Sequence, residues 1–332
     1  MNREGIDEKM NYAYVNNPLY QDQNEELKSI YNKWRQRQFG KRIPVHVFGS
    51  GSEGNSIYLK PYHTLIDLGF TYKAYQEYSP TFFLDVDYII ITHHHGDHLN
   101  PATLARVLDK YPHIRIIMSD FMWNTITHPH YKADYIKRDK GETVPFGHDM
   151  TYKTDERGQR IRAESKYAPT YLAHRSKFQR AEPQTIVTHT GKSFLFEPLT
   201  VKHGDIVNIA VQISDPDLEF EFLYASDLDN LDGERSFVDC HGQMQHVTGL
   251  RQNRTYTCMF LEANYDEAIL QAWYDNLQTN DPDYRSKKAR ADGNLRHISE
   301  QEALAYIERH LAENGLFVPL HASKTFGTLH QS

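Results

Sequence analysis

Apolar positions along this chain fall into short continuous runs separated by polar turns, which predicts many strands with helices between them. The clearest run covers 85–92, where a valine, a tyrosine and three isoleucines stand close together. Such a run is typical of a strand that is covered on both faces. Asn100 and Pro101 then supply the N-cap and first residue of a helix through Leu104 and Leu108. Further strands are predicted over 43–48, 57–59, 64–68, 206–213, 219–225, 255–261 and 316–320. This alternation indicates a mixed α/β architecture built in layers.

Three stretches depart from this pattern. Residues 1–40 are polar, with one exposed helix predicted over 24–37, and we interpret them as an arm ahead of a single domain over 41–332. Residues 121–182 have few aliphatic side chains and carry 12 Lys and Arg against 8 Asp and Glu. They are interpreted as an insertion, either a solvated loop or a patch that faces the substrate. Near the C-terminus, Ser299 and Glu302 predict a capped helix that continues through Leu311 and ends at Gly315.

Composition narrows the class of protein. The 332 residues are 39% hydrophobic and 24% charged, which is typical of a globular chain. No apolar run reaches the roughly 18–20 residues that cross a bilayer, and the first ten residues are polar, so we expect neither a membrane span nor a secretory signal. Cys240 and Cys258 are too few for a disulfide framework and are expected to be buried in a cytoplasmic protein. A net charge of −7 argues against a basic nucleic-acid-binding chain, whereas 19 histidines direct attention to metal.

One histidine cluster has the spacing of a metal site. It follows the buried strand over 85–92 and reads His-His-His-Gly-Asp-His over residues 93–98. Alternate residues of an extended segment face the same side, so His93 and His95 can hold one ion together, and His94 should point away. After the turn at Gly96, Asp97 and His98 can face a second ion. Imidazole combined with carboxylate oxygen suits zinc, iron or manganese.

Other candidate ligands also stand beside predicted strands. His203 precedes the strand over 206–213, Asp227 follows the strand over 219–225, and His321 ends the last strand. A turn sequence at 214–217 predicts that the first two of these strands form a hairpin. Any one of these residues is unremarkable alone, but together they predict ligands gathered at one edge of a sheet. Asp227 is placed to bridge two ions.

These residues, in this order, resemble the ligand motifs of the metallo-β-lactamase-fold hydrolases. Among these hydrolases, the sequence is most similar to the WalJ/YycJ-type nucleases, and it shares motifs with ribonuclease Z. It runs from about residue 43 to 321, without 121–182, and includes Gly-Ser-Gly-Ser-Glu-Gly-Asn at 49–55, Ile-Asp-Leu-Gly at 66–69, Glu-Ala-Asn-Tyr-Asp-Glu at 262–267 and Arg-His-Ile-Ser at 296–299. The resemblance implies an α/β fold of the four-layer αββα sandwich type. It also implies two divalent metal ions, Zn²⁺ or Mn²⁺.

The resemblance further implies a role for each candidate residue. His93, His95 and His203 would hold one ion, and Asp97, His98 and His321 the other, with Asp227 between them. Asp67 would orient a ligand histidine. His297, hydrogen-bonded to Glu262, would be the general acid. The predicted catalytic residues are therefore His297, Glu262 and Asp97. Ser323 would contact phosphate. Apart from the resemblance, the run of basic residues with Lys287, Lys288 and Arg290 stands close to His297 in sequence, and it is either a solvated run or a surface that follows a phosphate backbone.

The leading hypothesis is therefore a two-metal phosphodiesterase that hydrolyses nucleic acid, a DNA nuclease of the exonuclease type. A small-molecule hydrolase on the same fold, such as a cyclic-nucleotide phosphodiesterase or a lactonase, is one alternative, and an endoribonuclease is another. A third reading is a catalytically silent binding protein, which would be expected to lack at least one metal-ligating residue. This sequence has a metal-ligating residue type at every one of the seven ligand positions.

Overall fold

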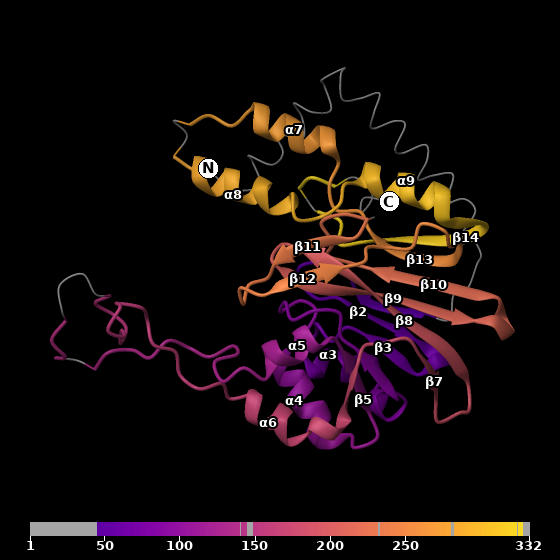
Figure 1. The fold of residues 1–332 in the computed structure, drawn as a ribbon, viewed down its shortest axis with the longest axis horizontal. Coiled ribbons are helices and arrows are strands. Elements are labelled where there is room, and N and C mark those ends of the chain that lie inside the picture. Colours follow the sequence, from indigo (N-terminus) through magenta and orange to yellow (C-terminus); the bar gives the residue numbers. More distant parts are fainter. Residues whose placement is uncertain are drawn as a thin grey trace.

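Two six-stranded sheets pack face to face in the part of the chain that the structure, a computed structural model, describes (Figure 1). The described residues are 45–139, 141–144, 149–231, 233–279, 282–323 and 325–327, so the arm predicted over 1–40 lies outside them. In the first sheet the order follows the sequence: β1 (Val45–Gly49), β2 (Ser56–Leu59), β3 (Thr64–Ile66), β4 (Tyr88–Ile90), β5 (Arg115–Met118) and β6 (Phe178–Arg180). Strands β1 to β3 are antiparallel, and β3 to β6 are parallel.

The second sheet combines antiparallel hairpins with two parallel pairings of strands. Its order is β14 (Leu311–Leu320), β13 (Tyr256–Glu262), β10 (Phe220–Ala225), β9 (Ile206–Asp215), β8 (Ser193–His203) and β7 (Gln184–Val187). All ten residues of β9 are buried, because this strand is central and covered on both faces. The predicted hairpin of β9 and β10 is present, with Phe222 opposite Ile213. A small ribbon of β11 (Arg235–Val238) and β12 (Met244–Val247) lies beside this sheet.

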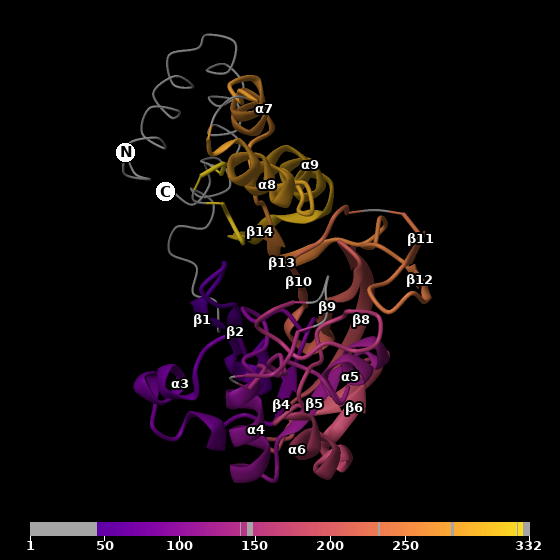
Figure 2. The same ribbon diagram turned by 90° about the vertical axis from the view of Figure 1, so that its left-hand side faces the viewer.

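Helices cover the outer face of each sheet (Figure 2). The first sheet packs against α3 (Tyr72–Tyr78), α4 (Pro101–Lys110), α5 (Asp120–Ile126) and α6 (Ala168–Ala173), and α7 (Glu267–Asp275), α8 (Tyr284–Asn294) and α9 (Glu300–His310) lie on the side of the second sheet. As predicted, the Asn100 side chain caps α4 by accepting a hydrogen bond from the Thr103 amide at 3.0 Å. The capping box of Ser299 and Glu302 is also present.

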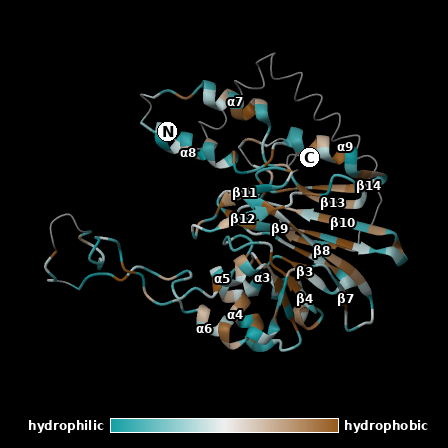
Figure 3. Cartoon of the chain, viewed as in Figure 1, coloured by the Kyte–Doolittle hydropathy of each residue, from teal (hydrophilic) through white to brown (hydrophobic). Residues whose placement is uncertain are grey.

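The apolar core is divided between the layers, as Figure 3 shows by hydropathy. One cluster, with Ile57, Ile90 and Phe222, fills the space between the two sheets. A second packs the first sheet against its helices, and a third packs the second sheet against α9. The layers therefore run helix, sheet, sheet, helix, and the predicted α/β fold with a four-layer αββα sandwich is confirmed. None of the described helices is long and apolar enough to cross a membrane.

The structure differs from the sequence predictions in the end of the last helix, the burial of one cysteine and the length of one strand. The last helix ends at His310, and Leu311 begins β14 because it pairs with Tyr256 of β13; Gly315 lies within that strand. Cys258 is buried as predicted, but Cys240 is exposed. The strand predicted over 85–92 is only three residues long, Tyr88–Ile90, although the Ile91 amide still donates to the Ile117 carbonyl at 2.9 Å just before the histidine loop.

The stretch predicted as an insertion over 121–182 is partly built into the body. Its ends form α5, α6 and β6, and the last of these is an edge strand of the first sheet. Between Tyr131 and Ser165, which are both buried, the described residues 132–139, 141–144 and 149–164 extend away from the body as a narrow projection (Figure 1). Isolated bridges join Tyr135 to Arg162 and Thr154 to Arg160 in this projection. Hydrophilic residues predominate along it (Figure 3).

Candidate metal centre

The polar residues singled out in the sequence meet at one edge of the sandwich. Asp67 follows β3, the histidine loop follows β4, and His203 is the last residue of β8. Asp227 follows β10, Glu262 ends β13, and His321 follows β14. Because the carboxyl ends of these strands open at the same edge, side chains more than 200 residues apart in the sequence become neighbours.

Asp227 lies at the centre of this cluster. Its Oδ2 is 3.4 Å from Nε2 of His93 and 3.4 Å from Nε2 of His98. Its Oδ1 is 3.6 Å from Nε2 of His321. Potential ligand atoms lie within 4.8 Å of one another in three groups that all include Asp227, namely His93, His95, His203 and Asp227; Asp97, His98 and Asp227; and Asp227, Glu262, His297 and His321. Asp227 is therefore the one residue that these three groups of described residues share.

The donor set fits divalent transition metals. Nε2 of His93 is buried without a hydrogen-bond partner, although an orphaned buried polar atom is costly. Burial lowers the pKa of His95 to about 4 and that of His203 to about 2, so both rings stay neutral and present a lone pair at neutral pH. Burial raises the pKa of Asp227, but His321 and His98 lower it more, and the carboxylate stays charged. Neutral imidazoles around a carboxylate are ligands for zinc or manganese.

His98 and His203 are each oriented through the ring nitrogen Nδ1. Nδ1 of His98 is 2.7 Å from Oδ2 of Asp67, a fully buried carboxylate that also accepts hydrogen bonds from the Thr92 amide and the Tyr224 hydroxyl at 2.9 Å. Asp67 thus contacts His98, one of the predicted ligands. Nδ1 of His203 is 3.1 Å from the carbonyl oxygen of Arg296. Such contacts hold the ring planes and direct Nε2 of His98 and of His203 toward Oδ2 of Asp227, at 3.4 and 3.8 Å.

Backbone strain is concentrated at this edge. Asp67, Asp227 and His321 have φ angles of 61°, 57° and 52°, in the left-handed region that non-glycine residues avoid. Each such residue costs about 1–3 kcal/mol and persists because its surroundings hold it. For Asp227 that support comes from Asn208, whose amide donates to the carbonyl oxygens of Ser226 and Asp227 at 2.6 and 2.7 Å. The strained turns direct these side chains into the cluster.

His297 differs from the ligands in its position and partners. It lies between α8 and α9, and its Nδ1 is 2.5 Å from Oε1 of the fully buried Glu262. The other oxygen of Glu262 accepts from the Leu228 amide at 2.9 Å. Burial lowers the pKa of His297, but the Glu262 carboxylate raises it, and the net shift is upward. The ring of His297 stacks on that of His321 with centroids 4.8 Å apart, which places it beside the cluster.

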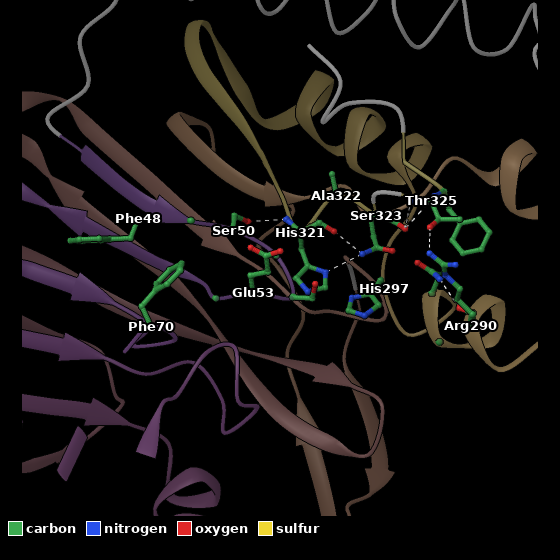
Figure 4. Close-up of a pocket in the computed structure, with 18 of the residues that line it drawn as sticks. Phe48, Ser50, Glu53, Phe70, Arg290, His297, His321, Ala322, Ser323 and Thr325 are labelled. Carbon is green, nitrogen blue, oxygen red and sulfur yellow. Dashed lines mark hydrogen bonds between the residues drawn. The ribbon is translucent and has the colours of Figure 1, made fainter. Parts of the chain in front are cut away.

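A pocket of about 740 Å³ opens next to His297 and His321 (Figure 4). The glycine-rich loop over 49–54 forms one wall, and Ser323 and Arg290 lie on another. Ser50 accepts a hydrogen bond from the His321 amide at 2.9 Å. Of the three predicted backbone-binding cations, only Arg290 is among the described residues that line this pocket. Lys287 and Lys288 are not, and the Lys288 ammonium instead lies 2.6 Å from the Asp292 carboxylate.

Sequence reasoning assigned no role to several polar residues that support the cluster. The Asn55 amide lies 2.8 Å from Nε2 of His98 and 3.2 Å from Oδ2 of Asp97. The Asn264 amide lies 3.0 Å from Nδ1 of His321 and donates to the His321 carbonyl at 2.7 Å. Both asparagines stand within motifs that carry the family resemblance, which was the available signal. His94 belongs to none of the described ligand groups, and its ring lies beside Phe121 with centroids 6.2 Å apart.

Comparisons with known proteins add a likeness in fold. No protein-family model matches the sequence, and no curated protein matches it. In structure the chain is similar to the short form of human tRNase Z, with 13% identity, 84% of this chain and 92% of that chain covered, and a TM-score of 0.45. It is also similar to the metallo-β-lactamase fold protein YhfI from Bacillus subtilis (14% identity, 86% and 90% covered, TM-score 0.46) and to yeast PDE1 (10%, 90% and 77%, 0.40). At such identities the reaction has to be argued from the site itself.

Proposed function

We propose that this protein is a dinuclear-metal phosphodiesterase that hydrolyses nucleic acid, with DNA cleaved from an end as its substrate. The observation that carries the proposal is the His297–Glu262 pair, which lies beside the ligand cluster around Asp227 and on the wall of an open pocket. A metal centre alone would serve many hydrolases. A buried carboxylate–histidine pair next to it provides a proton donor for a poor leaving group, which phosphodiester cleavage requires.

Two of the candidate groups around Asp227, together with the 3.7 Å contact between His321 and Asp97, support a ligand assignment. His93, His95 and His203 would hold one ion with Asp227, and Asp97, His98 and His321 would hold the other with the same carboxylate. When bound, two divalent ions supply water activation and stabilise the charge that develops on the phosphate. The protein's own contribution is to keep the His95 and His203 imidazoles neutral by burial and to orient His98 through Asp67.

His297 would hold and then deliver a proton. Its Nδ1 faces Glu262, so Nε2 is the nitrogen left to face a substrate. The carboxylate fixes this orientation and favours the protonated ring before transfer to the leaving oxygen. Glu262 is itself held by the Leu228 amide, so the pair needs little reorganisation during the reaction.

The pocket supports a nucleotide as the bound group. Its volume of about 740 Å³ falls in the range of small-molecule sites. Arg290 offers a planar, permanently charged guanidinium on the wall, and Ser323 lies near His297 on the same side. We propose that Arg290 contacts a backbone phosphate, with Ser323 next to the scissile one. Lys287 and Lys288 would add long-range attraction from the outside of α8.

A substrate panel with metal exchange tests this function. The protein, loaded with Zn²⁺ or Mn²⁺, is incubated with end-labelled single-stranded DNA, duplex DNA, RNA, a cyclic nucleotide and a lactone. We expect mononucleotides to be released from DNA ends, with Asp227→Ala losing both bound metal and activity. Activity on the lactone or the cyclic nucleotide alone would replace the proposal with a small-molecule hydrolase. Internal cuts in RNA would indicate an endoribonuclease, and metal binding without turnover a binding protein.

A further inference from the structure

We propose that His63, Asp85 and His189 form a second, separate binding site for a zinc-class divalent ion, at the end of the sandwich away from the candidate metal centre. One ligand atom from each of these three residues lies within 4.8 Å of the other two. None of them belongs to the Asp227-centred groups. The inference does not depend on the proposed function.

The three residues come from both sheets. His63 stands between a short 3₁₀ turn, η1 (Lys60–Tyr62), and β3, and Asp85 lies between the 3₁₀ turn η2 (Phe82–Leu84) and β4. His189 lies in the turn between β7 and β8 of the second sheet. Because β3 and β4 run parallel from this end to the histidine loop, the two sites lie at opposite ends of the same strands. An ion here would join the first sheet to the second.

The geometry brings the side chains together without a metal. The rings of His63 and His189 have centroids 4.4 Å apart and planes inclined by 57°, so they converge without stacking. Nδ1 of His63 lies 3.1 Å from Oδ1 of Asp85 and 2.8 Å from the Asp85 carbonyl oxygen. His63 holds this position with a φ of 47°, in the strained left-handed region. The cluster is therefore maintained by the backbone as well as by side-chain contacts.

A second carboxylate fixes His189 in the manner of metal-ligating histidines. Nδ1 of His189 lies 2.9 Å from both oxygens of Asp87, and the His189 amide donates to Oδ2 of Asp87 at 2.9 Å. The Asp87 amide in turn donates to the His63 carbonyl at 2.8 Å. Asp87 thus ties the two histidine segments together. With Nδ1 of His189 occupied, Nε2 is free to bind an ion, as in carboxylate–histidine–zinc arrangements.

The donor set selects the class of ion. Two imidazoles and one carboxylate favour zinc and its neighbours over magnesium or calcium, which prefer oxygen ligands. The Asp85 and His189 side chains are 57% and 52% exposed, so solvent reaches the cluster and can complete the coordination. An ion bound here stabilises the folded state, because the unfolded chain has no assembled site. We expect a structural clamp between the sheets.

The chain offers a matched control for this site. Nε2 of His174 lies 2.9 Å from Asp109 on the protein surface, an exposed histidine–aspartate pair of the ordinary kind. Among the described residues it belongs to no group of three ligands. His174→Ala therefore removes a similar side chain and ion pair without touching the proposed clamp.

The experiment measures zinc directly. Full-length wild type, His189→Ala, Asp85→Asn and His174→Ala are dialysed against buffered Zn²⁺, and zinc per chain is determined by elemental analysis. We expect both clamp variants to bind one zinc fewer than wild type and to lose part of the zinc-dependent rise in Tm, and the control to match wild type. Hydrolytic activity should be unchanged in all variants. Equal zinc content and an equal Tm rise in His189→Ala and His174→Ala would overturn the proposal, whatever the outcome for the function.

Discussion

Replacing His297 separates proton donation from metal binding. In the structure, Nδ1 of His297 lies 2.5 Å from Glu262, and the His297 ring stacks on that of His321. Among the ion pairs of the described residues, none within 4 Å joins His297 to Asp227, whereas His321 does form one. His297→Ala should therefore keep its metals and its fold. Removing a general acid costs about 10²–10⁴-fold in rate, which corresponds to roughly 3–5 kcal/mol at 1.36 kcal/mol for each tenfold change.

The size of the loss should depend on the leaving group. A sugar hydroxyl leaves as a strongly basic alkoxide and needs the proton, whereas p-nitrophenolate does not. On a dinucleotide we expect the full loss of about 10²–10⁴-fold in kcat/KM, and on a p-nitrophenyl phosphodiester less than about tenfold. Glu262→Gln keeps an acceptor for the Leu228 amide but removes the charge next to the imidazole. A charge-assisted hydrogen bond contributes about 1.5–3 kcal/mol, so its loss should be milder, about 10- to 100-fold.

The assay is steady-state kinetics on both substrates, with metal content measured on the same samples. His321→Ala serves as the comparison, since a ligand variant should lose metal and both activities together. If His297→Ala also loses metal, His297 is a ligand, as its place in the third group of candidate atoms would allow. If both substrates slow by the same factor with metal retained, the acid role is wrong and His297 only anchors phosphate.

Three further predictions concern binding, packing and pH. Arg290→Gln should weaken DNA binding and lower the slope of log affinity against log salt by about 1, whereas Lys288→Gln on the outside of α8 should have a smaller effect, both measured by fluorescence anisotropy. Gly69→Ala should lower metal affinity and cost about 1–3 kcal/mol in urea unfolding, because the added Cβ would lie 1.8 Å from a carbonyl oxygen of the histidine loop; wild-type values would contradict this packing. Asp215→Ala should cost about 1–3 kcal/mol at pH 7, since the buried carboxylate accepts from the Tyr62 hydroxyl at 2.9 Å. Burial raises the pKa of Asp215, but its hydrogen bonds lower the pKa to below the usual value. The stability that the Asp215 carboxylate contributes is therefore present above about pH 4 and should disappear as the pH falls through the folded-state pKa. A cost of Asp215→Ala that is equal at pH 7 and pH 3 would refute this.

Some strands could not be predicted from the sequence, because features that favour a strand and features that oppose one occur in the same segment. Strand β8 is eleven residues long and alternates in burial, but it contains Pro198, which normally argues against a strand in the middle of a sheet. Here Pro198 pairs with Val211 of β9, and the long hairpin register holds β8 in place. The end of α9 was misplaced for a similar reason. The helical periodicity continues through Leu311, but pairing with Tyr256 of β13 makes that residue the start of a strand.

The sequence by itself determined the layered α/β class and the residue types of the candidate site. Both are local properties, since strand and helix periodicity, the spacing over 93–98 and the position of Asp227 after a strand can all be read from neighbouring residues. Only the tertiary structure decided which distant groups meet. It placed Arg290 at the pocket and Lys288 outside it, set Asn55 against His98, and brought His63 to His189 across the two sheets. Such contacts depend on how the sheets pack and on strained turns that tertiary contacts sustain, such as the hydrogen bonds from Asn208 at Asp227, and no local pattern encodes either.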